Sequence, residues 1–142
     1  MHSVVTATAL GVAFLVATAA ARAQPLAKAS HEGSSDVRVE ITELKRTGGD
    51  TVTLKAVFIN GTGKTFSPPH VSQIYLLNTA SRMKHPVAKD EKGRWVASPN
   101  SNINAGAKRE VWAKYAAPPA GVKVMTVVVP KFAPLEDVPL SE

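Results

Sequence analysis

Runs in which apolar and polar residues alternate dominate this 142-residue chain once its first segment is passed. Val37, Val39 and Ile41 alternate with polar neighbours, and a second alternating run covers residues 51–58. A period of two sends successive side chains to opposite faces of a β-strand. A Gly-Gly turn at residues 47–50 separates the two runs. The sequence therefore predicts an antiparallel hairpin here.

Five further segments are short, rich in β-branched or aromatic residues or bounded by turn residues: residues 71–78, 85–89, 94–98, 108–116 and 122–129. The second and third of these would form a small edge hairpin. No longer stretch after the first segment carries helical spacing. Short strands with a turn about every eight to twelve residues are typical of a β-sandwich. We therefore predict an all-β, immunoglobulin-like antiparallel β-sandwich of about seven strands, formed by residues 36–142.

The N-terminal segment has the pattern of a secretory signal peptide. Residues 4–21 contain no charged side chain, and Ala21, Arg22 and Ala23 then supply a small-x-small cleavage pattern. We predict a signal peptide over residues 1–23, with a small, polar, flexible leader over residues 24–35. A retained membrane anchor is the alternative, but the segment is rich in Ala and Thr and no Lys/Arg cluster follows it. The protein would thus be periplasmic or secreted, without a transmembrane segment after cleavage.

Composition excludes several classes of site. The chain has no cysteine, so disulfides, thiolate metal sites and cysteine nucleophiles are ruled out. Its 17 Lys and Arg residues against 11 Asp and Glu give a net charge of +6. The basic residues are scattered and are densest over residues 82–94. Because exported proteins seldom meet nucleic acid, we expect an acidic protein, an anionic glycan or a lipid surface to be the partner, and no nucleic acid.

Residues 36–140 resemble small bacterial exported domains with an immunoglobulin-like or telokin-like β-sandwich, which occur alone or beside OmpA-like domains. The resemblance is carried by Gly106, by Trp-Ala-Lys-Tyr at residues 112–115, by Ala-Pro-Pro at residues 117–119 and by residues 130–139. It implies the fold but no activity, because that family is mostly uncharacterised. The sequence contains no OmpA-like segment, so peptidoglycan binding is not implied.

Nothing in the sequence nominates catalytic residues or a cofactor. It has no nucleophile elbow or S-x-x-K motif, and its adjacent acidic pairs occur in predicted turns. We expect a protein that is not an enzyme. His31, His70 and His85 are widely spaced and are expected to be exposed loop residues, not metal ligands. The alternative function is a periplasmic small-ligand or metal-binding protein that uses His70 and His85.

The candidate partner-binding residues are His85, Lys92, Arg94 and Trp95 of the predicted edge hairpin. Basic side chains around one aromatic residue suit an anionic or protein partner, and an exposed Trp is a common anchor at interfaces. Trp95 covering one end of the core is the alternative. The sequence thus predicts an exported, non-enzymatic domain that binds a secreted protein or a component of the cell envelope through this hairpin.

Overall fold

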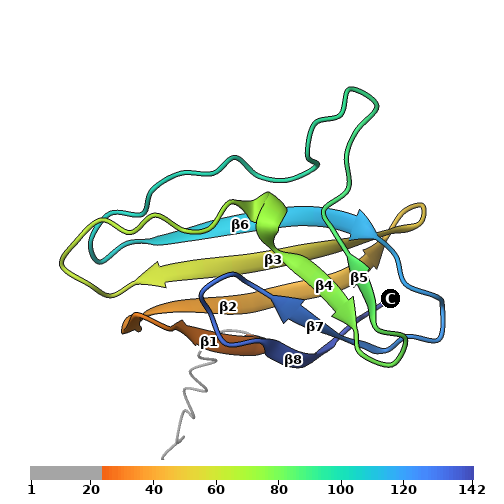
Figure 1. Ribbon diagram of the computed structural model, residues 1–142, viewed down its shortest axis with the longest axis horizontal. Coiled ribbons are helices and arrows are strands. Elements are labelled where there is room, and N and C mark those ends of the chain that lie inside the picture. The colour runs from red at the N-terminus through yellow and green to blue at the C-terminus, as the bar shows by residue number, and fades with distance from the viewer. Residues whose placement is uncertain (1–23) are drawn as a thin grey trace, which may run out of the picture.

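The computed structural model describes residues 24–142, which form two antiparallel sheets packed face to face (Figure 1). In the first sheet the strand order is β1-β2-β3-β6, with the strands at Ala27–His31, Ser34–Thr47, Thr51–Asn60 and Lys108–Ala116. In the second sheet the order is β5-β4-β7-β8, with the strands at Met83–His85, Tyr75–Asn78, Val124–Val128 and Leu135–Pro139. A 3-10 turn, η1 (Val71–Gln73), leads into β4.

The strand order is that of an immunoglobulin domain. Such domains place strands A, B and E in one sheet and strands C, F and G in the other. Here β2, β3 and β6 occupy the places of A, B and E, and β4, β7 and β8 occupy the places of C, F and G. Strand β5 lies beside β4, as strand C′ does beside C. The predicted immunoglobulin-like sandwich is confirmed, with eight strands over residues 24–142 in place of about seven.

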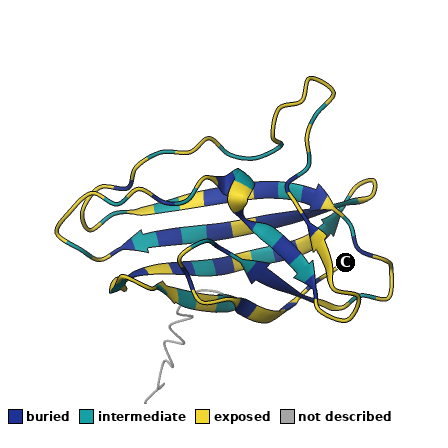
Figure 2. Ribbon diagram, in the orientation of Figure 1, coloured by how far each residue is buried: buried dark blue, intermediate teal, exposed yellow. Residues whose placement is uncertain are grey.

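The core lies between the sheets and is filled by the inward residues of both. The alternation read from the sequence holds along β6, where Val111, Ala113 and Tyr115 are buried while Trp112 is exposed. On β3 every second residue from Val52 to Asn60 points inward and is buried. Figure 2 shows the resulting banding of buried and exposed residues along the long strands. Burial of these apolar side chains is the main force that holds the sheets together.

On the edge that faces away from β3, strand β2 pairs first with β1 and then with residues near Ser141. Its first half pairs with β1, as far as the register Ala27–Ile41. A bulge follows between Ile41 and Glu43. Beyond the bulge β2 pairs with the chain terminus, because the Ser141 N–H donates to the Leu44 carbonyl at 3.0 Å and forms a parallel bridge there. The end of the second sheet is thereby joined to the edge of the first.

The structure corrects several predicted boundaries. Residues 24–35 are not a flexible leader, since Ala27–His31 form β1. The strand predicted at residues 71–78 is split into η1 and β4, and the one predicted at 122–129 shortens to Val124–Val128. The predicted signal peptide, residues 1–23, lies outside the described residues. Within the described part, no helix is long and apolar enough to cross a membrane.

Tyr115 ties β6 to the entrance of the second sheet. Its side chain is fully buried, and its hydroxyl donates to the Ile74 carbonyl at 2.9 Å. Burial raises the pKa of this hydroxyl above its usual value, so the group stays protonated and able to donate. A buried hydroxyl needs such a partner, because an unpaired one is costly.

We predict that Tyr115→Phe destabilises the fold by about 1–2 kcal/mol, because the Ile74 carbonyl loses a buried hydrogen bond while the ring still fills its place. Urea unfolding measures the free-energy change. The matched control is Tyr75→Phe, which removes a hydroxyl from the half-buried outer face of β4. Equal unfolding midpoints for the two variants would contradict this role for the Tyr115 hydroxyl.

Candidate partner-binding hairpin

The segment between β5 and β6 covers the outer edge of β6 and then protrudes from it. Ala88 donates its N–H to the Lys114 carbonyl at 2.8 Å, and Lys114 donates to the Val96 carbonyl at 2.9 Å. Val96 in turn donates to the Ala88 carbonyl at 2.9 Å, so the two legs of the segment also pair with each other. An isolated bridge joins Lys89 to Trp95 further out. In Figure 1 the tip between β5 and β6 rises clear of both sheets. We call residues 87–97 the edge hairpin.

The turn at the tip is ordered by Asp90. One of its carboxylate oxygens accepts hydrogen bonds from the N–H groups of Lys92 and Arg94, both at 2.9 Å. The other oxygen accepts from Arg94 Nε at 3.0 Å. Gly93 supplies the positive φ of 76° that closes the turn. A side-chain cap of this kind fixes the backbone at the tip without any contact to the core.

The hydrogen bonds to Asp90 also set its acidity. The Arg94 N–H is the main cause that holds the pKa of this carboxyl below its ordinary value of 3.8, and the Arg94 side chain and the Lys92 N–H lower it further. The folded turn therefore favours the ionised carboxylate. Its contribution to stability is fully present above the ordinary pKa and is lost as the pH falls through the lower, folded value.

Trp95 is presented on one leg of the edge hairpin. Its side chain is 42% exposed, and Lys89 Nζ lies 4.3 Å from the centre of its ring. This cation–π contact holds the ring across the hairpin while leaving part of it accessible. Lys89 belongs to the basic stretch noted in the sequence, and the 89–95 pairing is what places its side chain beside Trp95.

Of the four predicted partner-binding residues, three lie at or near the exposed tip, and His85 is buried. Lys92 and Arg94 are exposed, beside the partly exposed Trp95. His85 is only 8% exposed and its Nδ1 lies 3.0 Å from the Ala116 carbonyl, so it packs beneath the hairpin instead of contributing to its surface. The inward register of β5 explains this, because His85 lies opposite the buried Leu76.

The other histidines do not assemble a metal site in the described residues. His31 packs edge-on against Phe66 and Phe132, and is therefore not an exposed loop residue. His70 is exposed, and its Nδ1 accepts a hydrogen bond from the Ser72 N–H. Across residues 24–142, no three His, Asp or Glu side chains converge in a way that would hold a metal ion.

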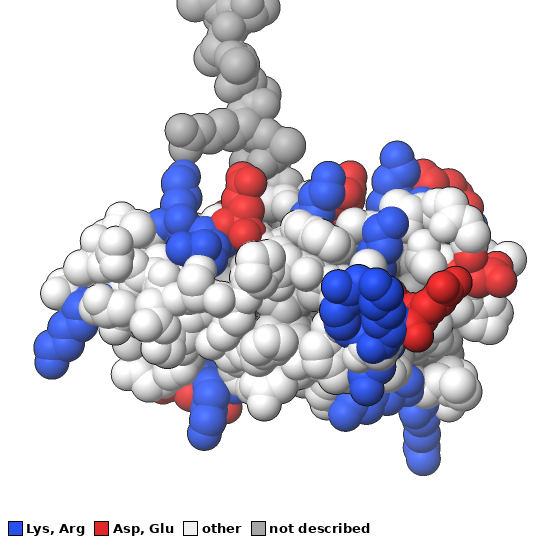
Figure 3. All heavy atoms as spheres, turned by 90° about the horizontal axis from the view of Figure 1, so that it is seen from above, with Lys and Arg blue, Asp and Glu red and all other residues white. Residues whose placement is uncertain are grey.

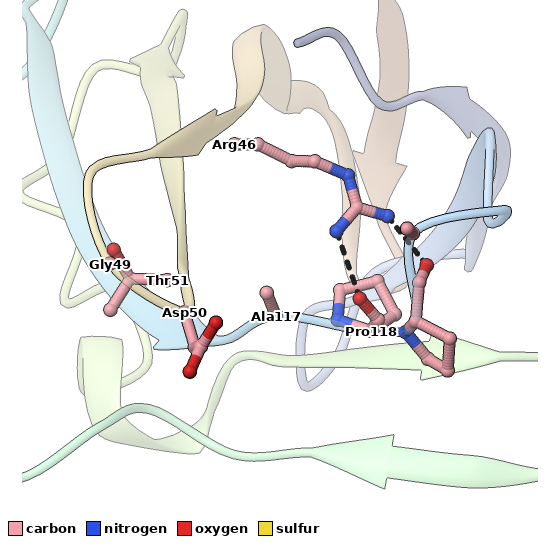
Figure 4. A pocket seen from close by; sticks show the side chains of 8 residues that line it. Arg46, Gly49, Asp50, Thr51, Ala117 and Pro118 are labelled. Carbon is pink, nitrogen blue, oxygen red and sulfur yellow. Dashed lines mark hydrogen bonds between the residues drawn. The ribbon is translucent and has the colours of Figure 1, made fainter.

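A pocket of about 450 Å³ opens at the far end of β2, between the β2–β3 turn and the loop at Ala117 and Pro118. Its cation, Arg46, donates to the carbonyls of Pro118, Pro119 and Val122 at 2.7–3.1 Å. Figure 4 shows the guanidinium turned toward that loop and away from Asp50. Because the Arg46 guanidinium already donates these hydrogen bonds within the protein, it holds the 118–122 loop in place and does not make the pocket an anion site.

Lys and Arg side chains are spread over the surface that is seen from above in Figure 3, with one dense group beside acidic side chains. The edge hairpin protrudes on this side in Figure 1. The hairpin contains three basic residues, Lys89, Lys92 and Arg94, and two acidic ones, Asp90 and Glu91. The hairpin surface thus carries both signs of charge around a partly exposed aromatic ring.

Comparison with known proteins gives one similar structure. No protein family and no curated protein sequence matches the chain. Among solved structures, it is similar to MPT63, a secreted protein from Mycobacterium tuberculosis whose crystal structure was determined at 1.5 Å resolution. The two share 15% identity over 79% of this chain and 87% of that one, with a TM-score of 0.48. The fold assignment therefore depends on the strand order described above, and the telokin-like resemblance and its link to OmpA-like domains stay predictions.

We predict that Arg46→Met destabilises the protein by about 2 kcal/mol, because three carbonyls of the 118–122 loop lose a charged donor. Thermal and urea unfolding measure the change. Arg38→Met is the matched control, since Arg38 lies exposed on the outer face of β2. The assignment of Arg46 as a clamp fails if the two variants are equally stable.

We predict that the Asp90 carboxyl titrates below pH 3.8, and that the amide signals of Lys92 and Arg94 shift with it. NMR titration between about pH 2 and 6 follows both events, because protonation weakens the bonds that those amides donate. In Asp90→Asn the same amide signals should stay unchanged over this range. A carboxyl midpoint at or above 3.8 would contradict the capped turn.

Proposed function

We propose that this protein is an exported, non-enzymatic binding module whose edge hairpin contacts a secreted protein or a component of the cell envelope. The observation that carries the proposal is the combination of order and exposure at the tip. Asp90 fixes the turn with three hydrogen bonds, while Trp95, Lys92 and Arg94 remain accessible. A loop that is already ordered loses little conformational entropy on binding, so less of the free energy of its contacts is spent on ordering it.

The chemistry of the tip favours a protein partner. Trp95 offers a flat apolar ring that is already held by Lys89. Trp and Arg are the residues that most often dominate binding energy at interfaces. Arg94 is joined to Asp90 through Nε, which leaves its terminal amino groups to donate to an acidic or carbonyl group of the partner. Lys92 adds a mobile charge that steers an acidic partner toward the tip.

Export supports this assignment from the sequence side. The N-terminal 23 residues have a signal-peptide pattern, and the chain has no cysteine that an oxidising compartment would pair. We therefore place the protein outside the cytoplasm, in the periplasm or beyond it.

The test is capture of the partner in the native host. The exported protein, tagged at its C-terminus, is cross-linked in the envelope, and captured material is identified by mass spectrometry at low and high salt. We predict one dominant protein that survives high salt and whose capture falls at least about tenfold in Trp95→Ala, because a buried aromatic anchor contributes about 2 kcal/mol or more. The Lys92→Glu/Arg94→Glu variant should abolish capture.

The matched control is Lys28→Glu/Arg38→Glu, which reverses two exposed charges on the outer face of the first sheet. All variants are first compared by thermal unfolding, so that loss of capture is not loss of fold. Capture that is unchanged in both hairpin variants would overturn the proposed site. Capture that vanishes with salt for every variant would point to an anionic glycan or lipid surface instead.

A further inference from the structure

On the outer face of the second sheet, β4 and β7 carry mostly apolar residues, although a surface strand normally turns polar residues toward water. On β4 the outward residues are Tyr75 and Leu77, and on β7 they are Val124, Thr126 and Val128. The register places Tyr75 opposite Val128 and Leu77 opposite Thr126, so these side chains form one continuous patch. Antiparallel sheets usually bury one apolar face and leave a polar one to water. Strand β7 instead carries two apolar residues, Val124 and Val128, on its outer face, on either side of Thr126.

The patch is partly exposed in the described part of the chain. Val124 is 43% exposed, Tyr75, Leu77 and Val128 are half-buried, and Thr126 between them is buried at 5% exposure. The first sheet differs, since its outer face carries an ion pair between Glu43 and Lys55 at 3.2 Å. A partly exposed apolar patch that joins neighbouring strands is a candidate interaction surface.

The two edges of this face carry opposite charges. On β5, Lys84 is exposed and its Nζ lies 4.0 Å from the centre of the Tyr75 ring, which places the ammonium over the face. On β8, Glu136 and Asp137 are both exposed and form the bulge between two inward residues. Strands β5 and β8 lie three strand spacings apart, about 14 Å, so these charges are too distant to pair within one molecule.

We propose that a second copy of this chain covers this face, in a dimer whose two-fold axis runs parallel to the strands of the second sheet. With that axis β4 lies over the partner's β7, and β5 lies over the partner's β8. Lys84 then meets the Glu136 and Asp137 edge of the partner at both ends of the interface. An axis across the strands would stack β5 on β5 and β8 on β8, which places like charges together. The face is therefore self-complementary in one orientation only, as an isologous interface requires.

The size of the face sets the expected affinity. Four strands of about five residues cover about 14 Å by 17 Å of sheet. That is well below the standard interface, which buries about 800 Å² on each partner. The net charge of +6 also opposes association of two copies. The dimer is accordingly expected to be weak and reversible.

Sedimentation equilibrium of the purified protein, from about 10 μM to about 500 μM at about 0.15 M salt, is the first test. We expect a monomer–dimer equilibrium that Leu77→Lys abolishes, because a lysine at the centre of the patch would be buried unpaired. Val57→Lys is the matched control, since Val57 is a half-buried outward residue on the first sheet. A protein that is monomeric throughout, or a dimer that only Val57→Lys disrupts, overturns the proposal.

A charge exchange tests the orientation. Lys84→Glu and Glu136→Lys should each weaken the dimer by at least about tenfold, because each places like charges together at both ends of the interface. The double variant Lys84→Glu/Glu136→Lys restores opposite charges and should return within about threefold of the original affinity. Additive losses in the double variant would overturn the strand-parallel axis. All variants are checked for an unchanged thermal midpoint.

Discussion

Pairing of the backbone groups at the sheet edges is the constraint on which the rest of this structure depends. A sandwich of two open sheets presents unpaired N–H and C=O groups along its outer strands, and these must be satisfied or protected. Here β2 is satisfied by β1 in its first half and by Ser141 in its second. The bulge between Ile41 and Glu43 marks the change of partner. The exposed edge of β6 is satisfied by the hairpin of residues 87–97.

The same constraint explains why the candidate site lies where it does. The legs of the hairpin are held by backbone hydrogen bonds to Lys114, which belong to the fold. The tip makes no such backbone hydrogen bonds to β6, and its turn is ordered by the side chain of Asp90. The base of this segment is therefore bonded to β6, whereas the tip, which carries the proposed binding residues, is ordered without contact to the sheets. His85 lies outside this hairpin, in β5, where its pairing with Leu76 turns it inward.

Local patterns predicted the elements whose signal is local. Alternation with a Gly-Gly turn gave the β2–β3 hairpin, and β6 matches its predicted range of residues 108–116. The errors arose where pairing with residues far away in the sequence determines the local structure. Strand β1 is short and rich in small residues, and it is a strand because β2 pairs with it. His85 is flanked by polar and proline residues, so only its pairing with Leu76 reveals that it points inward. Lys89 and Trp95 likewise come together only through the register of the hairpin.

The two proposed surfaces belong to different sheets, and this has a consequence for binding. The hairpin is attached to β6 of the first sheet, whereas the apolar face belongs to β4 and β7 of the second. A dimer through that face would leave both hairpins uncovered and would carry two copies of the site. For a partner that is itself repeated, as envelope polymers and multimeric proteins are, the second contact becomes intramolecular and gains an effective concentration in the millimolar range. A small hairpin tip with a modest affinity of its own would then suffice for stable attachment. The weakness expected of the dimer makes this gain depend on the local concentration of the protein, so attachment would strengthen where the partner gathers many copies together.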